Sequence, residues 1–357
     1  MLGATGSASV FAAGKRTLAK PVAPRPPAIE YAMKRQDTQN GFAPTASMAA
    51  LQQRAALLRK LRQFFYDRDF LEVETPLLAS EIIPELHVEP KRVEGGGFLQ
   101  ASPELHMKRL MAAGAEAIFQ VTRSFRAGER GQLHNPEFTI VEWYRTGDDM
   151  QAGMNLLDEL VQSLLGTARA LRTTYADAFK RTLGLCPHTA TIEELSSAAE
   201  RAEVSVPATM DRAARDEWLN LLLATRIEPQ LGRERPEIVY HHPATQASLA
   251  RTEPSPFGYE VAERFEVYYR GIELANGFHE LTDAAELRRR FEAVNAAREA
   301  DGRPPLPLPE SLLAAMQHGL PDCTGCALGF DRLAMLAATA SSIDDVMAFP
   351  VQPGHLQ

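Results

Sequence analysis

The sequence has no uninterrupted apolar run of about 18 residues or more, the length that a membrane-spanning helix requires. Cysteine is scarce as well: the 357 residues include three, an odd number and too few for a disulfide framework in a chain of this length. A basic excess is also missing, because the formal net charge is -8. These absences disfavour a membrane role, a secreted disulfide scaffold and binding of a phosphate backbone through overall charge. They predict a globular protein of the reducing cytoplasm.

The first 29 residues contain no acidic side chain, since none precedes Glu30. Alanine, serine, glycine and proline dominate there, so residues 1–47 are predicted to be a disordered extension. The basic residues in it suit an organelle transit peptide, but the prolines of residues 21–27 would break the amphipathic helix that such a peptide needs. An upstream extension, with the functional start at Met33 or Met48, is the simpler interpretation.

Residues 48–357 are predicted to form one domain of the α+β class. Apolar residues at helical spacing between Leu51 and Phe65 indicate an amphipathic helix, and residues 155–227 are expected to be mainly helical. Ser102-Pro103-Glu104 has the composition of a helix start. Strands are predicted at residues 70–76, 118–126, 138–145, 237–242 and 261–275, with a strand-to-helix unit at residues 325–340.

Two segments carry residues suited to phosphate. In the hairpin of residues 121–144, alternation allows Arg126 and Tyr144 to share one face, and a guanidinium donates paired hydrogen bonds to phosphate. Taken alone, this is more often an edge hairpin with ordinary surface arginines. Glycines of residues 325–329 precede a helix that begins near Arg332, where N–H groups favour anions. Taken alone, they indicate only tight packing of a strand against a helix.

Two further segments concentrate carboxylates. Glu273 and Glu280, seven residues apart, could meet around a divalent ion or balance local arginines. Glu104 at a helix start could bind a substrate ammonium group or merely cap the helix. The Cys323-x-x-Cys326 pair lacks the second pair of ligands of a zinc site, so zinc is disfavoured.

In order, these segments resemble the three signature motifs of class II aminoacyl-tRNA synthetases. Residues 70–76 look like motif 1, residues 125–144 like motif 2 and residues 325–333 like motif 3. The strings at residues 134–139 and 277–281 are similar to the lysine branch, and the resemblance covers residues 50–350. It implies an antiparallel sheet flanked by helices, the use of ATP and Mg²⁺, and a homodimer with motif 1 at its interface.

The resemblance also implies roles for individual residues. Arg126 corresponds to the arginine that holds the α-phosphate and the substrate carboxylate, and Arg332 to the one that grips the γ-phosphate of a bent ATP. The implied nucleotide-binding residues are Arg126, Gly128, Asn135, Glu273, Leu274, Gly329 and Arg332. The implied amino-acid-binding residues are Ser102, Pro103, Glu104, Tyr144, Glu280 and Ala327. Glu273 and Glu280 would also face magnesium. Catalysis would then rest on positioning and charge stabilisation, without a protein nucleophile.

Three departures refine the resemblance. Only about 20 residues expected to be structured precede motif 1, too few for the anticodon-binding barrel of a lysyl-tRNA synthetase. Ala327 stands where the synthetases have glycine, and its methyl group should crowd the substrate. Both features resemble the free-standing lysine ligases that modify elongation factor P. The segment Arg126-Ala127-Gly128-Glu129 replaces the usual Arg-Asn-Glu, which displaces the carboxylate expected at the adenine to Glu129.

Three functions follow as hypotheses. The leading one is ATP-dependent activation of lysine or β-lysine and its transfer to a lysine of elongation factor P. A catalytic fragment that aminoacylates transfer RNA is the second, and the missing barrel disfavours it. A regulatory paralogue without chemistry is the third. It is disfavoured because Arg126, Arg332, Glu273 and Glu280 are all present.

Overall fold

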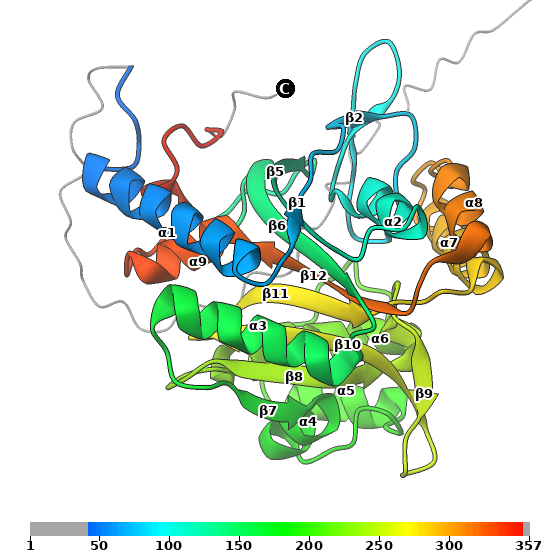
Figure 1. Ribbon diagram of the computed structural model, residues 1–357. Helices are drawn as coiled ribbons and strands as arrows, with labels where there is room; N and C mark the ends of the chain where they lie inside the picture. Colours follow the sequence, from blue (N-terminus) through cyan, green and yellow to red (C-terminus); the bar gives the residue numbers. More distant parts are fainter. Residues whose placement is uncertain (1–41, 353–357) are drawn as a thin grey trace, which may run out of the picture.

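The computed structural model describes residues 42–352 and is built around one large sheet (Figure 1). In spatial order its strands are β1 (Leu71–Glu72), β5 (Ala117–Phe125), β6 (Glu137–Thr146), β12 (Cys323–Gly329), β11 (Ile272–His279), β10 (Glu260–Tyr269), β8 (Glu237–Pro243) and β7 (Leu171–Thr174), with β9 (Thr252–Pro254) paired to β10. Among the strand pairs of residues 42–352, only β1–β5 and β7–β8 are parallel. The predicted antiparallel sheet flanked by helices is therefore confirmed.

Helices cover the sheet on both faces. They are α1 (Met48–Tyr66), α2 (Glu104–Ala112), α3 (Met150–Leu165), α4 (Tyr175–Leu183), α5 (Ile192–Arg201), α6 (Arg215–Leu222), α7 (Ala284–Ala300), α8 (Glu310–Gly319) and α9 (Phe330–Ala337). Short helical turns occur at Leu223–Ile227, Glu228–Gln230, Ala244–Gln246 and Ile343–Val346. A second sheet, of β2 (Leu78–Ala79), β4 (Phe98–Leu99) and β3 (Lys91–Arg92), lies beyond the edge of the large one.

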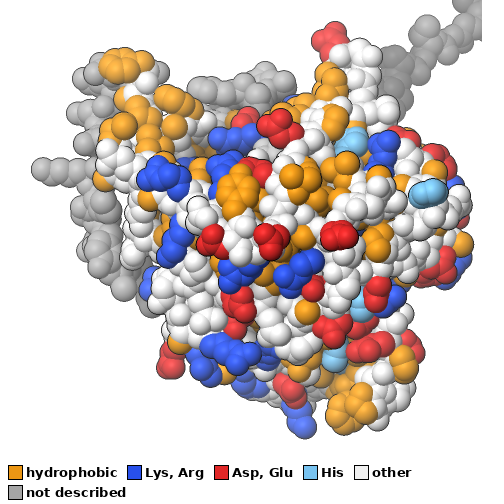
Figure 2. All heavy atoms as spheres, viewed as in Figure 1, with side chains coloured by type: hydrophobic (Ala, Val, Ile, Leu, Met, Phe, Trp, Pro, Cys, Tyr) orange, Lys and Arg blue, Asp and Glu red, His pale blue; other side chains and the backbone are white. Residues whose placement is uncertain are grey.

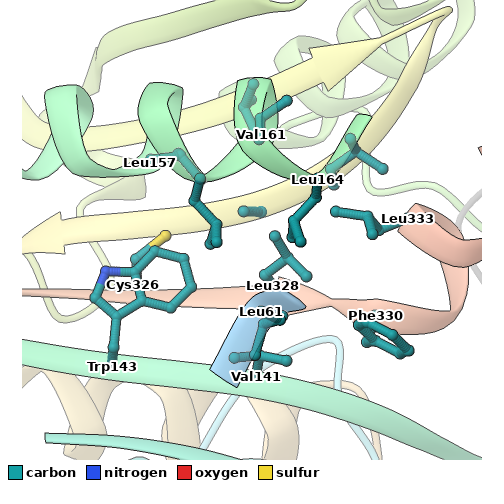
Figure 3. Close-up of a cluster of buried hydrophobic side chains, with 14 of the residues drawn as sticks. Leu61, Val141, Trp143, Leu157, Val161, Leu164, Cys326, Leu328, Phe330 and Leu333 are labelled. Atoms are coloured by element: carbon teal, nitrogen blue, oxygen red, sulfur yellow. The ribbon is translucent and has the colours of Figure 1, made fainter. Parts of the chain in front are cut away.

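The main core lies between the sheet and the helices α1, α3 and α9. Figure 3 shows Leu157 and Leu164 of α3 directed toward Leu328 of β12, with Val141 and Trp143 of β6 below. Because side chains alternate along a strand, placing Val141 and Trp143 in this core turns Glu142 and Tyr144 to the opposite face. The core therefore determines which side chains of the central strands are free to form a site.

Residues 42–47, which precede the first helix, pack against the C-terminal part of the chain. Residues 1–41 lie outside the described residues. The backbone N–H of Thr45 donates to the carbonyl of Ala348 at 2.8 Å, and Ala46 is buried. Ser47 then caps α1 by accepting a hydrogen bond from the N–H of Ala50. These six residues therefore pack with the domain predicted for residues 48–357.

Most predicted elements are present, with two corrections. The single strand expected at residues 261–275 is two strands, β10 and β11, because Arg270 and Gly271 both take positive φ angles, 52° and 74°, and form a tight turn. The strand expected at residues 70–76 is reduced to the two paired residues of β1. A period-two pattern marks extended chain but does not reveal a turn inside it.

Charges of both signs mix on the face that carries α1 and α3. Figure 2 shows Lys and Arg side chains interspersed with Asp and Glu across that face, without a continuous basic stripe among the residues described there. Within residues 42–352, none of the helices combines the length and the apolar character needed to cross a bilayer.

Candidate active site

Tyr144, Ala327 and Glu273 lie on the face of β6, β12 and β11 that points away from the main core. The pairing register sets Glu142, Ala327 and Asn276 side by side, and Tyr144 beside Gly325 in the next row. Successive rows two residues apart share a face. The site is therefore built on three rigid neighbouring strands.

The same alternation separates Cys323 from Cys326. Three residues apart on β12, the two side chains point to opposite faces and belong to different apolar clusters. Both thiols are buried, and burial raises the pKa of each. Among the described residues, no group of histidine, cysteine and acidic side chains is arranged to hold a metal ion. Cys323 and Cys326 therefore do not converge on a common point.

One end of the face is a buried polar network between the strands and the start of α2. Ser102 donates from its hydroxyl to Glu142 at 2.7 Å, and the Tyr144 hydroxyl donates to the other oxygen of Glu142 at 2.6 Å. Lys108 lies between Glu104 and Glu280, with its Nζ 2.6 and 2.7 Å from their carboxylates. Pro103 is the N-cap residue of α2 and makes no side-chain capping bond there. The predicted amino-acid-binding residues of this segment are thus brought together.

Gly325 makes this network possible. A Cβ atom at this position would lie 2.3 Å from Oε1 of Glu280 and 2.3 Å from Cε1 of Tyr144. The lack of a side chain is what allows the carboxylate of Glu280, directly after β11, and the ring of Tyr144 on β6 to meet across β12. A glycine in this row is therefore a requirement of the site, beyond the packing role that its sequence context suggested.

Two carboxyl groups of the network are held out of water. Burial is the largest cause that raises the pKa of Glu142 to about 8, and the Glu104 carboxylate adds to it. Burial also raises the pKa of Glu280 to about 7, against the opposing effect of Lys108. Oε1 of Glu280 is buried and accepts no hydrogen bond from the described residues. This end can therefore accept hydrogen bonds from a cationic ligand.

Glu142 and Lys108 are the residues that sequence reasoning missed. Glu142 lies two positions before Tyr144 on the same strand, so alternation placed it on the same face. Lys108 lies four residues after Glu104, one helical turn away. Both spacings are visible in the sequence. A lysine beside predicted binding acids is usually exposed to solvent, however, whereas Lys108 is 1% exposed.

The raised pKa values predict a dependence of stability on pH. The folded protein keeps protons on Glu142 and Glu280 that the unfolded chain, with a carboxyl pKa of 4.5, releases. The free energy of unfolding should therefore fall as the pH rises from 4.5 to about 8. Glu142→Gln should make this fall shallower, whereas the exposed Glu94→Gln should not. Thermal denaturation across this pH range measures how steeply the free energy of unfolding falls. An equally steep fall in wild type and Glu142→Gln would contradict the prediction.

Arg126 lies at the other end of the face, directly after β5. Its backbone N–H donates to the carbonyl of Pro136 at 2.9 Å, and its guanidinium stacks over Phe138 at 5.1 Å from the ring centroid. The nearest acid is Glu129, at 3.9 Å. The Nε atom of Arg126 is buried and has no hydrogen-bond partner among the described residues. A buried donor of this kind fits an anionic oxygen supplied by a ligand.

Arg332, on α9, lies at the same end. It donates to the carbonyls of Leu133 and Glu273 at 3.2 and 2.9 Å, and to Nε2 of His134 at 2.7 Å. Leu133 and His134 belong to the loop that begins at Arg126. The two arginines predicted to bind ATP therefore flank a single loop, at the end of the site opposite Lys108.

The other predicted nucleotide residues surround these arginines. Asn135 is buried and bonds through its amide to the carbonyl of Glu137 and the N–H of Val351. Gly128 has a φ of 78°, which a side chain would strain. Gly329 is the N-cap residue of α9, and a Cβ atom there would lie in ordinary contact, at 3.8 Å, with Cδ of Arg332 and the carbonyl oxygen of Leu274. Leu274 turns its side chain into the main core, so that only its backbone faces the site.

A β-bulge explains how Glu273 reaches this face. Ala275 pairs with Val267 and Glu273 with the next residue, Tyr268, which leaves Leu274 as the extra residue. The bulge reverses the alternation, so Glu273 and Glu280 point to the same face although an odd number of residues separates them. Their Cα atoms are nevertheless about 20 Å apart along the strand. The structure does not bring the two carboxylates together, and a shared magnesium ion remains a prediction.

A groove of about 630 Å³ lies outside this site. It runs between α2, α8 and the segment after β1, and its lining includes Thr75, Pro76, His106, Leu110 and His318. It contains none of the predicted ATP-binding residues, so the groove is not the predicted nucleotide site.

Comparison with known proteins gives the class to which this architecture belongs. The family model described as "tRNA synthetases class II (D, K and N)" matches residues 42–353, and this chain therefore belongs to that family. Within it, the chain is 48% identical over 317 residues to the "Elongation factor P--(R)-beta-lysine ligase" of Edwardsiella ictaluri (strain 93-146), a match that covers 86% of this chain and 97% of that relative. Ligases of the same name from Salmonella dublin and Klebsiella pneumoniae (strain 342) match with the same identity and coverage.

Proposed function

We propose that this protein is an ATP-dependent ligase that activates lysine, in its β-amino form, as an adenylate and transfers it to a lysine side chain of elongation factor P. The observation that carries the proposal is the buried network at the start of α2, because its acids outnumber its cations. The activity named for the relatives agrees with this chemistry.

The amino-acid end fits a substrate with two ammonium groups. Glu104 and Glu280 pair with one internal cation, Lys108, and Glu142, bonded to Ser102, belongs to the same buried network. A buried carboxylate without a positive partner is costly, and a charge-assisted hydrogen bond from an ammonium group offsets that cost. Ala327 lies between Glu142 and Asn276 in the pairing register, where its methyl group narrows the middle of the site. We propose that this methyl group shapes the choice between isomers of lysine.

The nucleotide end fits the triphosphate of ATP. Arg126 would hold the α-phosphate and the substrate carboxylate, and Arg332 the γ-phosphate. The carboxylate oxygen attacks the α-phosphorus, the bond to pyrophosphate breaks, and the fixed guanidinium groups stabilise the charge that develops on the phosphate oxygens. An amine of the acceptor then attacks the carbonyl carbon and releases AMP. Gly128, Asn135, Leu274 and Gly329 complete this end.

Magnesium fits the nucleotide end best at Glu273. Its carboxylate lies 3.6 Å from Arg332, and magnesium in such sites is commonly held by one or two carboxylates together with phosphate oxygens. Glu280 lies at the other end and pairs with Lys108 at 2.7 Å. We therefore propose Glu273 as the magnesium ligand in this conformation and assign Glu280 to the amino-acid pocket.

The proposed function is tested by ATP–pyrophosphate exchange with purified protein. We expect exchange with β-lysine or α-lysine, followed by transfer of the activated amino acid to elongation factor P and none to transfer RNA. Exchange followed by transfer to transfer RNA alone would replace the protein acceptor with the nucleic-acid one. The absence of exchange with either isomer would favour the regulatory hypothesis. The cytoplasmic location that we propose is supported by the three cysteines, which are all free thiols.

We also propose that the protein is a homodimer that buries the segment around β1. Leu71, on the edge strand β1 of the large sheet, is 62% exposed, and Leu77 and Leu78, at the start of the small sheet, are 41% and 53% exposed. An edge strand with exposed apolar side chains invites pairing unless something covers it. The groove beside it, lined by Thr75 and Leu110, offers a surface for a second copy. The resemblance of this segment to motif 1 supports the same interface.

The dimer proposal predicts a specific effect of charge at this edge. The double substitution Leu71→Asp and Leu78→Asp should yield monomers, because a carboxylate in an apolar interface loses its hydration. Leu171→Asp is the matched control, since Leu171 is 38% exposed on β7, the opposite edge strand of the same sheet. Sedimentation equilibrium measures the mass. A wild-type monomer, or a dimer that survives the double substitution, would contradict the prediction.

A further inference from the structure

The loop of residues 126–136 links the two arginines that are proposed to bind the triphosphate. It begins at Arg126, and the carbonyl of Leu133 and Nε2 of His134 accept hydrogen bonds from Arg332 at 3.2 and 2.7 Å. Inside the loop, the N–H of Gly131 donates to the carbonyl of His134 at 2.9 Å. The shape of the 126–136 loop therefore influences how far apart the two guanidinium groups lie.

A C-terminal segment, residues 342–352, is attached to this loop. The carbonyl of Gln132 accepts hydrogen bonds from the N–H of Ile343 at 2.9 Å and from the hydroxyl of Ser342 at 3.3 Å. Ile343 and Val346 are buried in the main core between the sheet and the helices. Because the C-terminal segment is anchored in the core, its bonds fix the loop relative to the sheet.

Arg130 makes the strongest connection between the loop and the C-terminal segment. Its Nη2 pairs with the Asp344 carboxylate at 2.5 Å, and its Nε donates to the carbonyl of Val351 at 2.8 Å. Its Nη1 donates to the carbonyl of Gly131, the next residue of the loop, at 2.9 Å. The side chains of Arg130 and Asp344 are each 23% exposed, so the pair is partly shielded from water. The guanidinium of Arg130 is therefore engaged within the protein at every nitrogen atom.

Asn135 connects the same two parts of the chain. Its amide oxygen accepts a hydrogen bond of 3.0 Å from the N–H of Val351, and its amide nitrogen donates to the carbonyl of Glu137 at 2.6 Å. Asn135 is 2% exposed. Val351 is thus bonded through its carbonyl to Arg130 and through its N–H to Asn135, which fastens the C-terminal segment to both halves of the loop.

We propose that Arg130 is a positioning residue for ATP, which acts by tying the 126–136 loop to the C-terminal segment. The inference rests on the proposed function and deepens it. Arg126 and Arg332 would hold a triphosphate at two points, so a change in their separation weakens both contacts. A misplacement of about 1 Å at a binding group can cost as much as 100-fold. The amino-acid pocket lies at the opposite end of the site and should be unaffected.

The test measures KM for ATP and for β-lysine in pyrophosphate exchange. Arg130→Met should raise KM for ATP by about 5- to 20-fold, the scale for losing hydrogen bonds to a partly exposed charged group, and leave KM for β-lysine unchanged. The exchanged pair, Arg130→Asp with Asp344→Arg, should recover part of the affinity for ATP, because it restores an ion pair with its charges reversed.

Arg145→Met is the matched control. Arg145 pairs with Asp148 at 2.7 Å, is 32% exposed and lies at the other end of β6, away from the loop. The variant should keep the wild-type KM for ATP. An equal rise in KM for ATP in Arg145→Met and Arg130→Met would show that loss of any such ion pair has this effect, and the inference would be wrong.

The exchanged pair separates positioning from direct binding of a phosphate by Arg130. In the second case an aspartate at position 130 would repel ATP whatever stands at position 344, so the absence of any recovery would overturn the inference. A purely structural role would reduce the folded fraction and hence kcat, with KM for ATP unchanged. That result in Arg130→Met would overturn the inference while leaving the proposed function intact. If wild type exchanges with neither isomer of lysine, both fail. Thermal denaturation of each variant confirms that it is folded.

Discussion

Replacing Lys108 with methionine is expected to lower the free energy of unfolding at neutral pH by about 3–5 kcal/mol, the cost of leaving buried acids without their cation. Lys108 is 1% exposed and is bonded to Glu104 and Glu280 at 2.6 and 2.7 Å. Methionine fills a similar volume, so the change reports on charge more than on packing. Chemical denaturation of wild type and variant measures the difference.

Two controls make this result interpretable. Lys60→Met, on the exposed face of α1, should change stability by less than about 0.5 kcal/mol. The double variant Lys108→Met with Glu280→Gln should recover part of the loss, because one of the unpaired acids is then neutral. The loss should also shrink at lower pH, since Glu280, with a pKa of about 7 beside Lys108, becomes protonated. A loss below about 1 kcal/mol would mean that water reaches the network.

The sequence allowed the site to be outlined because its motifs lie on regular strands. Alternation correctly joined Arg126 and Tyr144 to one face, and the same rule could have included Glu142. The helix start at Glu104 and the hairpin of β5 and β6 were predicted close to their observed bounds. These features depend on local periodicity and capping, which the sequence expresses directly.

Other features depend on contacts that no local pattern expresses. The bulge at Leu274 turns Glu273 to the site face, and its presence follows from how β10 and β11 pair. Whether Glu273 and Glu280 meet likewise depends on the extended length of β11 rather than on their spacing in the sequence. Tertiary contacts thus decide the roles of these two acids.

The largest effect on activity is expected from Arg126. Arg126→Ala should lower the rate of pyrophosphate exchange by about 10²–10³-fold, the scale for removing a donor fixed against charge that develops in the transition state. Its guanidinium makes no ion pair closer than the 3.9 Å contact with Glu129, so the fold should tolerate the change. Arg332→Ala is a less specific test, because Arg332 also bonds to the backbone of Leu133 and Glu273.

Arg123 provides the matched control on the same strand. Three residues before Arg126, its side chain points to the opposite face, where it donates to Thr139 at 3.0 Å. Arg123→Ala should therefore leave exchange close to the wild-type rate. Arg126→Lys should retain part of the activity, since lysine keeps the positive charge but loses the planar fork that donates two parallel hydrogen bonds. Equal losses in Arg123→Ala and Arg126→Ala would point to a general effect on folding, and the assignment of the α-phosphate to Arg126 would be wrong.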